Sequence, residues 1–194
     1  MSTLDRRTLI VDAAIELIAA QGLRALTHRA LDTALDLPVG SASYYFRTKR
    51  ALIEAIVDRI TDRSRTDFAA RLAPATAVDP GAAARGIADW LDRLLAERRD
   101  HLIARHALVL DLLSDADLHT RLAGSLFSAA RARELFAAMG VADPTTAAAD
   151  FIAVLEGAVF DRFAGGRTDL TPGTPDSVRQ LTTLLTIYFR GVRP

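Results

Sequence analysis

Residues 27–50 read T-H-R-A-L-D-T-A-L-D-L-P-V-G-S-A-S-Y-Y-F-R-T-K-R, and this stretch decides the fold. Thr27 is a suitable N-cap for a short helix through about Ala34, because a threonine hydroxyl accepts a hydrogen bond from the first free amides of a helix. Pro38 then interrupts the pattern, and a second short helix is expected over about 39–45. The stretch therefore predicts a helix, a tight turn and another helix.

The second short helix has a face of small residues, formed by Gly40, Ser41, Ala42 and Ser43. Small side chains let a helix approach a duplex closely, so that its N-terminal residues reach base edges in the major groove. Several side chains around this face can donate to phosphate; they are Thr27, His28, Arg29, Tyr44, Tyr45, Arg47, Lys49 and Arg50. Val39, at the start of the helix, is a further candidate DNA-contact residue. The composition alone also fits an ordinary helical hairpin whose aromatic residues are core and whose charges solvate one face.

The rest of the chain also predicts helices. Apolar spacing indicates a first helix that ends at Gly22 and a long helix from Thr48 toward Leu72, ended by Pro74. Three later helix starts pair an N-cap residue with proline at the first helical position; they are Asp79-Pro80, Asp143-Pro144 and Thr174-Pro175.

Between these starts, helices are expected over about 81–98, 100–114, 116–138, 145–164 and 175–191. The predicted fold is all-α: an N-terminal three-helix domain with a helix-turn-helix over 1–50, a connecting helix over 51–75, and a larger helical domain over 76–194.

Composition excludes several classes of protein. The 194 residues hold 24 basic and 24 acidic side chains, so any nucleic-acid contact must come from a local cluster. Without cysteine there is no disulfide or thiolate site, and His101 and His106 are five apart, which is not the spacing of a metal pair. We therefore expect no enzyme, cofactor or metal. No run of about 18 apolar residues and no signal-peptide core occurs, which predicts a cytoplasmic protein without a membrane partner.

Three features of the first sixty residues occur together: the first amphipathic helix, the pair Leu26-Thr27, and the run 39–52, V-G-S-A-S-Y-Y-F-R-T-K-R-A-L. With these features, about residues 5–60 resemble the N-terminal domain of TetR-family transcriptional regulators. The resemblance implies a homodimeric repressor that leaves its operator on binding a small molecule. It implies a DNA-binding domain over 1–50 and an effector-binding and dimerisation domain over 76–194. It also implies that the helix over 39–45 enters the major groove, and that Thr27, Tyr44 and Lys49 hold phosphates.

Three positions depart from the family pattern. Ser43 stands where a tyrosine is most frequent, Tyr45 replaces a frequent histidine, and Asp36 takes the place of the usual glycine of the turn. Aspartate can adopt the left-handed conformation that such a turn needs, though less readily than glycine.

The last two expected helices are apolar on more than one side, which one monomer core does not easily cover. Gly157 in mid-helix makes sense if a neighbouring helix approaches closely there. The resemblance implies that these helices pair with their symmetry mates, and the candidate interface residues are Gly157, Phe160, Leu181, Leu184, Leu185 and Tyr188. The alternative is a helix buried within its own domain.

An effector pocket is expected among the helices over 81–164, where the family keeps its cavity. The candidate lining residues are mostly apolar or aromatic; they are Trp90, Leu94, His106, Leu110, Leu113, Phe127, Phe151, Leu155 and Glu156. His106 is either a ligand anchor or a core histidine with a satisfied ring, and Glu156 is a ligand contact, an interface ion pair or a solvated corner. The competing function is a helical protein-interaction module that does not bind DNA.

Overall fold

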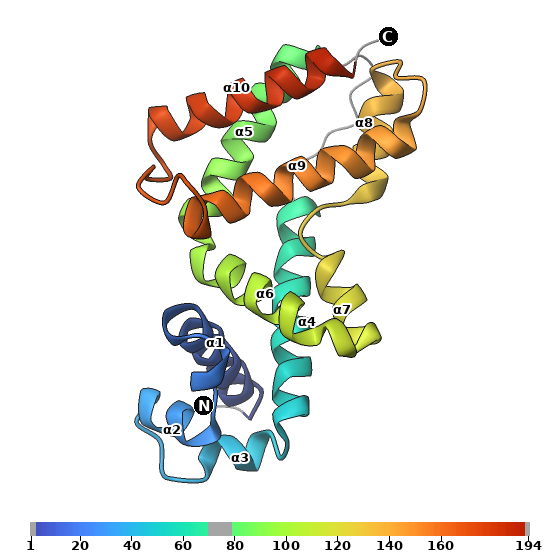
Figure 1. Ribbon diagram of the computed structural model, residues 1–194. Coiled ribbons are helices and arrows are strands. Elements are labelled where there is room, and N and C mark those ends of the chain that lie inside the picture. The colour runs from blue at the N-terminus through green and yellow to red at the C-terminus, as the bar shows by residue number, and fades with distance from the viewer. Residues whose placement is uncertain (1–2, 70–78, 193–194) are drawn as a thin grey trace. The chain divides into compact units, whose positions relative to one another are not determined.

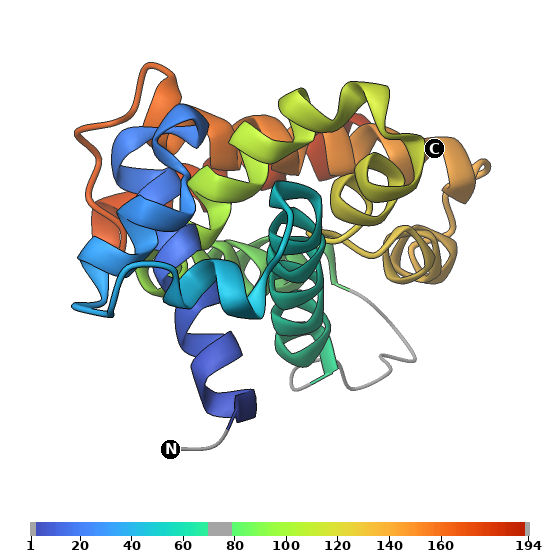
Figure 2. The ribbon, with the colours of Figure 1, turned by 90° about the horizontal axis from the view of Figure 1, so that it is seen from below.

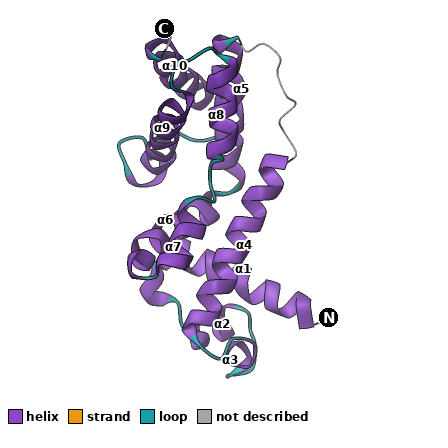
Figure 3. Cartoon of the chain, turned by 90° about the vertical axis from the view of Figure 1, so that its right-hand side faces the viewer, coloured by secondary structure: helices purple, strands orange, loops and turns teal. Residues whose placement is uncertain are grey.

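The computed structural model describes residues 3–69 and 79–192, and all regular structure within these ranges is helical (Figures 1 and 3), as the sequence predicted. The described residues form two compact units. The first contains residues 3–69 and 100–126, and the second contains residues 79–99 and 127–192. None of the helices within the described ranges has the length and hydropathy needed to cross a bilayer.

The first unit is built around one hydrophobic core. Its elements are α1 (Thr3–Gln21), η1 (Leu23–Ala25), α2 (His28–Ala34), α3 (Ser41–Tyr45), α4 (Lys49–Ala69), α6 (Arg99–Asp111), η2 (Leu112–Ser114) and α7 (Ala116–Ala123). Ile10 of α1, Leu31 of α2, Phe46 after α3 and Ile56 of α4 are almost fully buried in that core. Figure 2 shows the short α3 beside the start of α4. Because residues of α1, α2, α3 and α4 share this core, it holds the short helices against the long ones.

Ion pairs also join the helices of the first unit. The Arg59 guanidinium of α4 donates from Nε and Nη2 to both carboxylate oxygens of Asp12 on α1, at 2.7 and 2.8 Å. This bidentate hydrogen bonding raises the pKa of Arg59. Arg121 of α7 pairs with Asp58 of α4. These contacts fix α1 and α7 against α4 in addition to the apolar packing.

The second unit consists of α5 (Pro80–Glu97), α8 (Ala129–Ala138), α9 (Pro144–Ala164) and α10 (Pro175–Gly191). Within it α5 packs against α10, and α8 packs against α9 (Figure 1). The rings of Phe136, Phe151, Tyr188 and Phe189 form an aromatic cluster that joins α8, α9 and α10, with centroids 5.2 to 6.2 Å apart. Such edge-on and tilted pairs add to the free energy gained from burial.

A buried polar network also joins α5, α9 and α10 in the second unit. The Ser177 hydroxyl donates to Asp92, and the Arg162 guanidinium donates to Ser177 Oγ at 2.7 Å and to Gln180 Oε1 at 2.8 Å. Burial lowers the pKa of Arg162, and the charge of Asp92 opposes that shift. Because both buried charges are hydrogen-bonded, the network satisfies groups that would otherwise destabilise the fold.

The structure confirms the predicted helix starts that depend on an N-cap side chain or on proline at the first helical position. Thr27 Oγ1 accepts from Ala30 N at 3.1 Å, and Thr48 Oγ1 accepts from Ala51 N at 3.1 Å. The three cap-plus-proline starts, at Asp79, Asp143 and Thr174, each begin a helix as predicted. The expected end of the long helix near Leu72 and Pro74 lies outside the described residues.

Two predicted helices were wrong in their extent. The single helix expected over 116–138 is two helices, α7 and α8, because residues 124–128 interrupt it. In this segment the Ser125 hydroxyl donates to Leu122 O at 2.7 Å, and Ser128 is the N-cap of α8. The helix expected from 39 begins at Ser41, because Gly40 adopts φ 93°, which is outside the helical region.

Candidate functional site

The helix-turn-helix is formed by α2, the turn over 35–40 and α3. Asp36 has φ 49°, the left-handed conformation that the sequence indicated at this position. Leu37 N donates to Asp32 O at 2.8 Å, and Ser41 N donates to Pro38 O at 3.0 Å, which closes the turn. The turn therefore brings α3 back against α2 within six residues.

The surface around α3 carries exposed side chains of the types that contact nucleic acid. Val39 is 90% exposed and Tyr44 is 75% exposed, and the Tyr44 ring meets the half-buried Tyr45 ring edge-on at 5.3 Å. The exposed members of the predicted DNA-contact set also include Thr27, Arg29, Gly40, Ser43 and Lys49. The side chains of Val39 and Tyr44 are therefore accessible to a partner.

Three residues of the predicted set have partly internal roles. Ala42 is fully buried, so its methyl group packs in the core of the first unit. The Ser41 hydroxyl donates to Pro38 O at 2.6 Å, and the Ser43 hydroxyl donates to Gly40 O at 2.8 Å. Since the hydroxyl protons are used within the chain, the lone pairs of these two oxygens remain as acceptors.

His28 is half-buried, and its Nε2 atom is buried without a hydrogen-bond partner among the residues that the structure describes. Its neighbour Arg29 is exposed at the start of α2. The two residues of the predicted DNA-contact set therefore differ in exposure, and Arg29 is the more accessible of the two.

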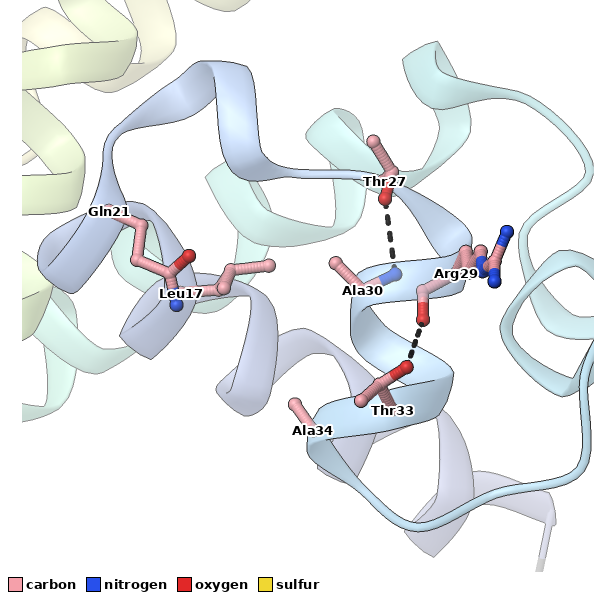
Figure 4. Close-up of a pocket in the computed structure, with 7 residues that line it drawn as sticks. All are labelled: Leu17, Gln21, Thr27, Arg29, Ala30, Thr33 and Ala34. Carbon is pink, nitrogen blue, oxygen red and sulfur yellow. Dashed lines mark hydrogen bonds between the residues drawn. The ribbon is translucent and has the colours of Figure 1, made fainter.

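A surface hollow of about 470 Å³ lies between the end of α1 and α2 (Figure 4). Leu17 and Gln21 line it from α1, and Thr27, Arg29, Ala30, Thr33 and Ala34 line it from α2 and its cap. The Thr27 hydroxyl oxygen accepts from Ala30 N, so its proton remains available to an acceptor in the hollow. This feature was not found in the sequence, because it depends on how α1 and α2 pack.

Two basic residues begin α4, and the structure gives them different environments. The Arg50 guanidinium donates to Glu54 at 3.0 Å and to Asp115, and the hydrogen bond to Asp115 raises the pKa of Arg50. Lys49 is exposed at the first position of the helix, directly after the Thr48 cap. Arg50 therefore serves to join α4 to α7, and Lys49 is the better candidate for an external anion.

The predicted effector residues are divided between the two units. In the second unit, the Trp90 ring meets Phe127 edge-on at 5.8 Å, and Leu94, Phe127, Phe151 and Leu155 are buried while Trp90 and Glu156 are half-buried. In the first unit, His106 Nδ1 is 2.7 Å from Leu102 O, and Leu110 and Leu113 are about two-thirds exposed. The structure brings Trp90 to Phe127, whereas Phe151 belongs to the aromatic cluster described above.

The predicted interface residues lie at different depths in the second unit. Leu181 and Leu185 are buried inside the unit, Leu184 and Tyr188 are half-buried, and the Tyr188 hydroxyl donates to Ala147 O at 2.8 Å. Phe160 is 45% exposed, and a methyl group added at Gly157 would meet nothing within 4 Å. Ile187, which is 64% exposed, was not in the predicted set.

No group of three or more histidine or acidic side chains among the described residues is placed to hold a metal ion. The geometry of the first unit is instead that of a helix-turn-helix whose second helix has exposed residues, and the adjoining α2 and α4 carry exposed basic and hydroxyl groups. This arrangement defines a DNA-binding transcription regulator.

Comparison with known proteins agrees with that class. Residues 10–56 match the bacterial regulatory proteins of the tetR family, and residues 78–186 match the tetracyclin repressor-like C-terminal domain. The chain belongs to the TetR family of transcriptional regulators.

Individual relatives are similar over different lengths. A curated HTH-type transcriptional regulator from Xanthobacter autotrophicus, encoded in the dhlA 5′ region, is 35% identical over 60 residues, which are 31% of this chain and 30% of that protein. A solved TetR-family structure from Streptomyces coelicolor is 28% identical with a TM-score of 0.67, covering 93% of this chain and 98% of that one. The multidrug binding protein EbrR in complex with ethidium is 26% identical with a TM-score of 0.63, covering 92% and 98%.

Proposed function

We propose that the chain is a homodimeric repressor that binds a pseudo-palindromic operator through α3 and leaves it when a small, mostly apolar effector binds. Such a protein acts in the cytoplasm, where the operator is. The observation that carries the proposal is the exposure of Val39, in the turn before α3, and of Tyr44 on α3, a helix that Ala42 anchors in the core of the first unit. A protein-interaction module without DNA binding gives no reason for phosphate-donor side chains such as Thr27 and Lys49 to be exposed at the starts of the two neighbouring helices, α2 and α4.

The chemistry of the exposed groups assigns roles to them. Thr27 and Lys49 donate to phosphate, and Tyr44 donates from its hydroxyl, which positions the protein without reading sequence. Val39 offers an apolar contact of the type that meets a thymine methyl group. The free lone pairs of the Ser43 hydroxyl suit an amino group of adenine or cytosine.

The proposed dimer uses the exposed side of α9 and α10. Gly157 and Phe160 of α9 and Ile187 of α10 are exposed, and the open space beside Gly157 allows the backbone of another helix to approach closely. A second copy of the same surface would cover these residues in a two-fold symmetric interface. The symmetry of the dimer then explains why the operator should be palindromic.

The proposed effector binds among those predicted pocket residues that belong to the second unit, where Trp90 and Phe127 offer ring edges and faces for an aromatic molecule. The similarity to EbrR, which is described as a multidrug binding protein and has been crystallised with ethidium, supports a flat aromatic effector. For release, the effector must bind the DNA-incompetent state more tightly, and a shift from nearly all bound to nearly all free takes about 5 kcal/mol of differential affinity. Two effector molecules per dimer can share that free energy.

A titration against the DNA upstream of the chain's own coding sequence tests the proposal. We expect one fragment to bind with an affinity that falls steeply with salt, and nuclease footprinting to show two related half-sites. Addition of the effector should release that fragment. If every upstream fragment bound no better than a scrambled duplex of equal length, the proposed operator would not lie there, and if a random duplex library also yielded no enriched sequence, DNA recognition itself would be refuted.

A further inference from the structure

The helix α3 is too short to fix its own geometry. It has five residues, its N-cap Gly40 provides no side-chain hydrogen bond, and it carries no acidic residue in its first turn and no basic residue in its last. An isolated helix of this length is unstable in water. The contacts that set its orientation must therefore come from other elements.

A buried carboxylate of α2 holds the N-terminal end of α3. Asp32 is 3% exposed, its Oδ2 accepts from Gly40 N at 2.7 Å, and its Oδ1 accepts from Ala42 N at 2.7 Å. Both carboxylate oxygens are thus used on amides that have no partner within the helix. A negative charge at a helix N-terminus is also favoured by the helix dipole.

A guanidinium of α1 holds the C-terminal end. Arg7 Nη1 donates to Tyr45 O at 2.7 Å, and the guanidinium carbon lies 4.4 Å from the centroid of the Phe46 ring. Phe46 is 1% exposed and follows α3 directly, so the ring fixes the point at which the helix ends. A positive charge at a helix C-terminus is favoured for the same reason as a negative one at the start.

We propose that Asp32 and Arg7 are positioning residues for DNA recognition, which hold α3 at its two ends with opposite charges and thereby determine which base pairs it contacts. The proposal rests on the proposed function of α3 as the helix that enters the major groove. Both residues act through α3, because Asp32 is buried beneath it and Arg7 bonds to its last carbonyl group. Each belongs to a helix that a fully buried residue anchors in the core, Leu31 in α2 and Ile10 in α1.

The negative charge of Asp32 makes the proposal testable, because charge repulsion and helix positioning predict opposite changes in operator affinity when Asp32 is replaced. A carboxylate near DNA repels phosphate, so its removal by itself should tighten binding to any duplex. If Asp32 instead positions α3, its replacement should weaken binding to the operator. Asp32→Asn keeps the size of the side chain but leaves only one acceptor oxygen, and its NH₂ group faces one of the two amides that the carboxylate binds. The variant should therefore lose operator affinity while its affinity for a scrambled duplex stays equal or rises.

The experiment compares Asp32→Asn with Arg7→Met and with two controls in the second unit. Asp143→Asn removes a carboxylate that also accepts from two helix amides, those of Thr145 and Thr146, and Arg133→Met removes an exposed guanidinium from α8. Each protein is titrated against the operator duplex and a scrambled duplex at several salt concentrations. Amide hydrogen exchange is measured by NMR on the DNA-free proteins.

We expect Asp32→Asn to weaken operator binding about tenfold or more and Arg7→Met to weaken it about threefold to tenfold, because each loses a charge-assisted hydrogen bond to α3. The controls should bind the operator like the wild type. Exchange at Ala42 should accelerate in Asp32→Asn while exchange at Ile56 in the core of α4 stays unchanged. The double variant should lose less than the product of the single effects, because one helix is released in both cases.

Two results would overturn the proposal. One is operator affinity in Asp32→Asn equal to or above that of the wild type, which is the outcome of charge repulsion alone. The other is an equal loss of affinity for both duplexes together with faster exchange at Ile56, which is the outcome of general destabilisation. If the wild type selects no duplex, the proposed function fails instead, and the exchange rate at Ala42 still decides whether Asp32 holds α3.

Discussion

Replacement of Lys49 by alanine should change the stability of the protein and its affinity for DNA in opposite directions. Lys49 is the first residue of α4, directly after the Thr48 cap, so its positive charge lies at the positive end of the helix dipole. Its removal should raise the free energy of unfolding by about 0.3 to 1 kcal/mol. If Lys49 pairs with phosphate, the same change should weaken binding to every duplex.

The magnitude of the binding loss follows from counterion release. Each phosphate contact contributes a slope of about −0.9 to the dependence of log affinity on log salt concentration, and a dimer would carry two copies of Lys49. The slope should therefore become shallower by about 1.8, which corresponds to roughly thirtyfold weaker binding at about 0.15 M salt.

The assay is a fluorescence anisotropy titration of a labelled duplex at four or more salt concentrations, together with thermal unfolding of the free protein. Arg133→Ala serves as the control, because it removes an exposed positive charge from α8 in the other unit. A Lys49→Ala variant whose affinity and salt slope equal those of the wild type would show that Lys49 does not contact phosphate. A loss confined to one duplex sequence would also contradict the phosphate role.

Three further predictions concern other parts of the chain. Gly157→Arg should shift the mass measured by sedimentation toward that of the monomer and abolish operator binding. Gly86→Arg, at a similarly open helical glycine, should change neither. A wild-type protein that is monomeric at micromolar concentration would refute the dimer. Ethidium should quench the fluorescence of Trp90, the only tryptophan, and release the operator over the same concentration range, and quenching without release would refute induction. The hydrogen bond from Arg50 lowers the pKa of Asp115 below its usual 3.8. This carboxylate therefore stabilises the fold above that pH, and the stabilisation is lost as pH falls through the lowered value. Asp115→Asn should reduce the steepness of acid unfolding below pH 4, and an unchanged acid transition would refute the pairing.

The helix ends were predictable because their signals are local. The caps at Asp79, Asp143 and Thr174 and the stop at Gly22 depend on residues within four positions along the chain, which the sequence shows directly. The exposed α3 surface was predictable for the same reason, since its residues are contiguous. The break at residues 124–128 was not, because its single glycine and two serines are also tolerated within an amphipathic helix.

The contacts that hold α3 were beyond prediction from sequence. Asp32 is ten residues from Ala42, and Arg7 is 38 residues from Tyr45, so both contacts depend on how α1 and α2 pack. An isolated aspartate in a short helix and an arginine near the start of the chain carry no pattern that distinguishes them from solvated charges. The burial of Ala42 was missed in the same way, because small residues suit both a core and a DNA-facing surface.

The ratio of two dissociation constants tests the central claim most directly. The wild-type protein is titrated against a duplex that carries the upstream operator and against a scrambled duplex of equal composition, at one salt concentration near 0.15 M, and the number of protomers per duplex is measured by sedimentation. A TetR-family regulator that recognises its operator through α3 should bind the operator at least about 10³-fold more tightly, with two or more protomers per duplex in an even number. Equal affinity for the two duplexes, or a single protomer bound per operator, would contradict the account.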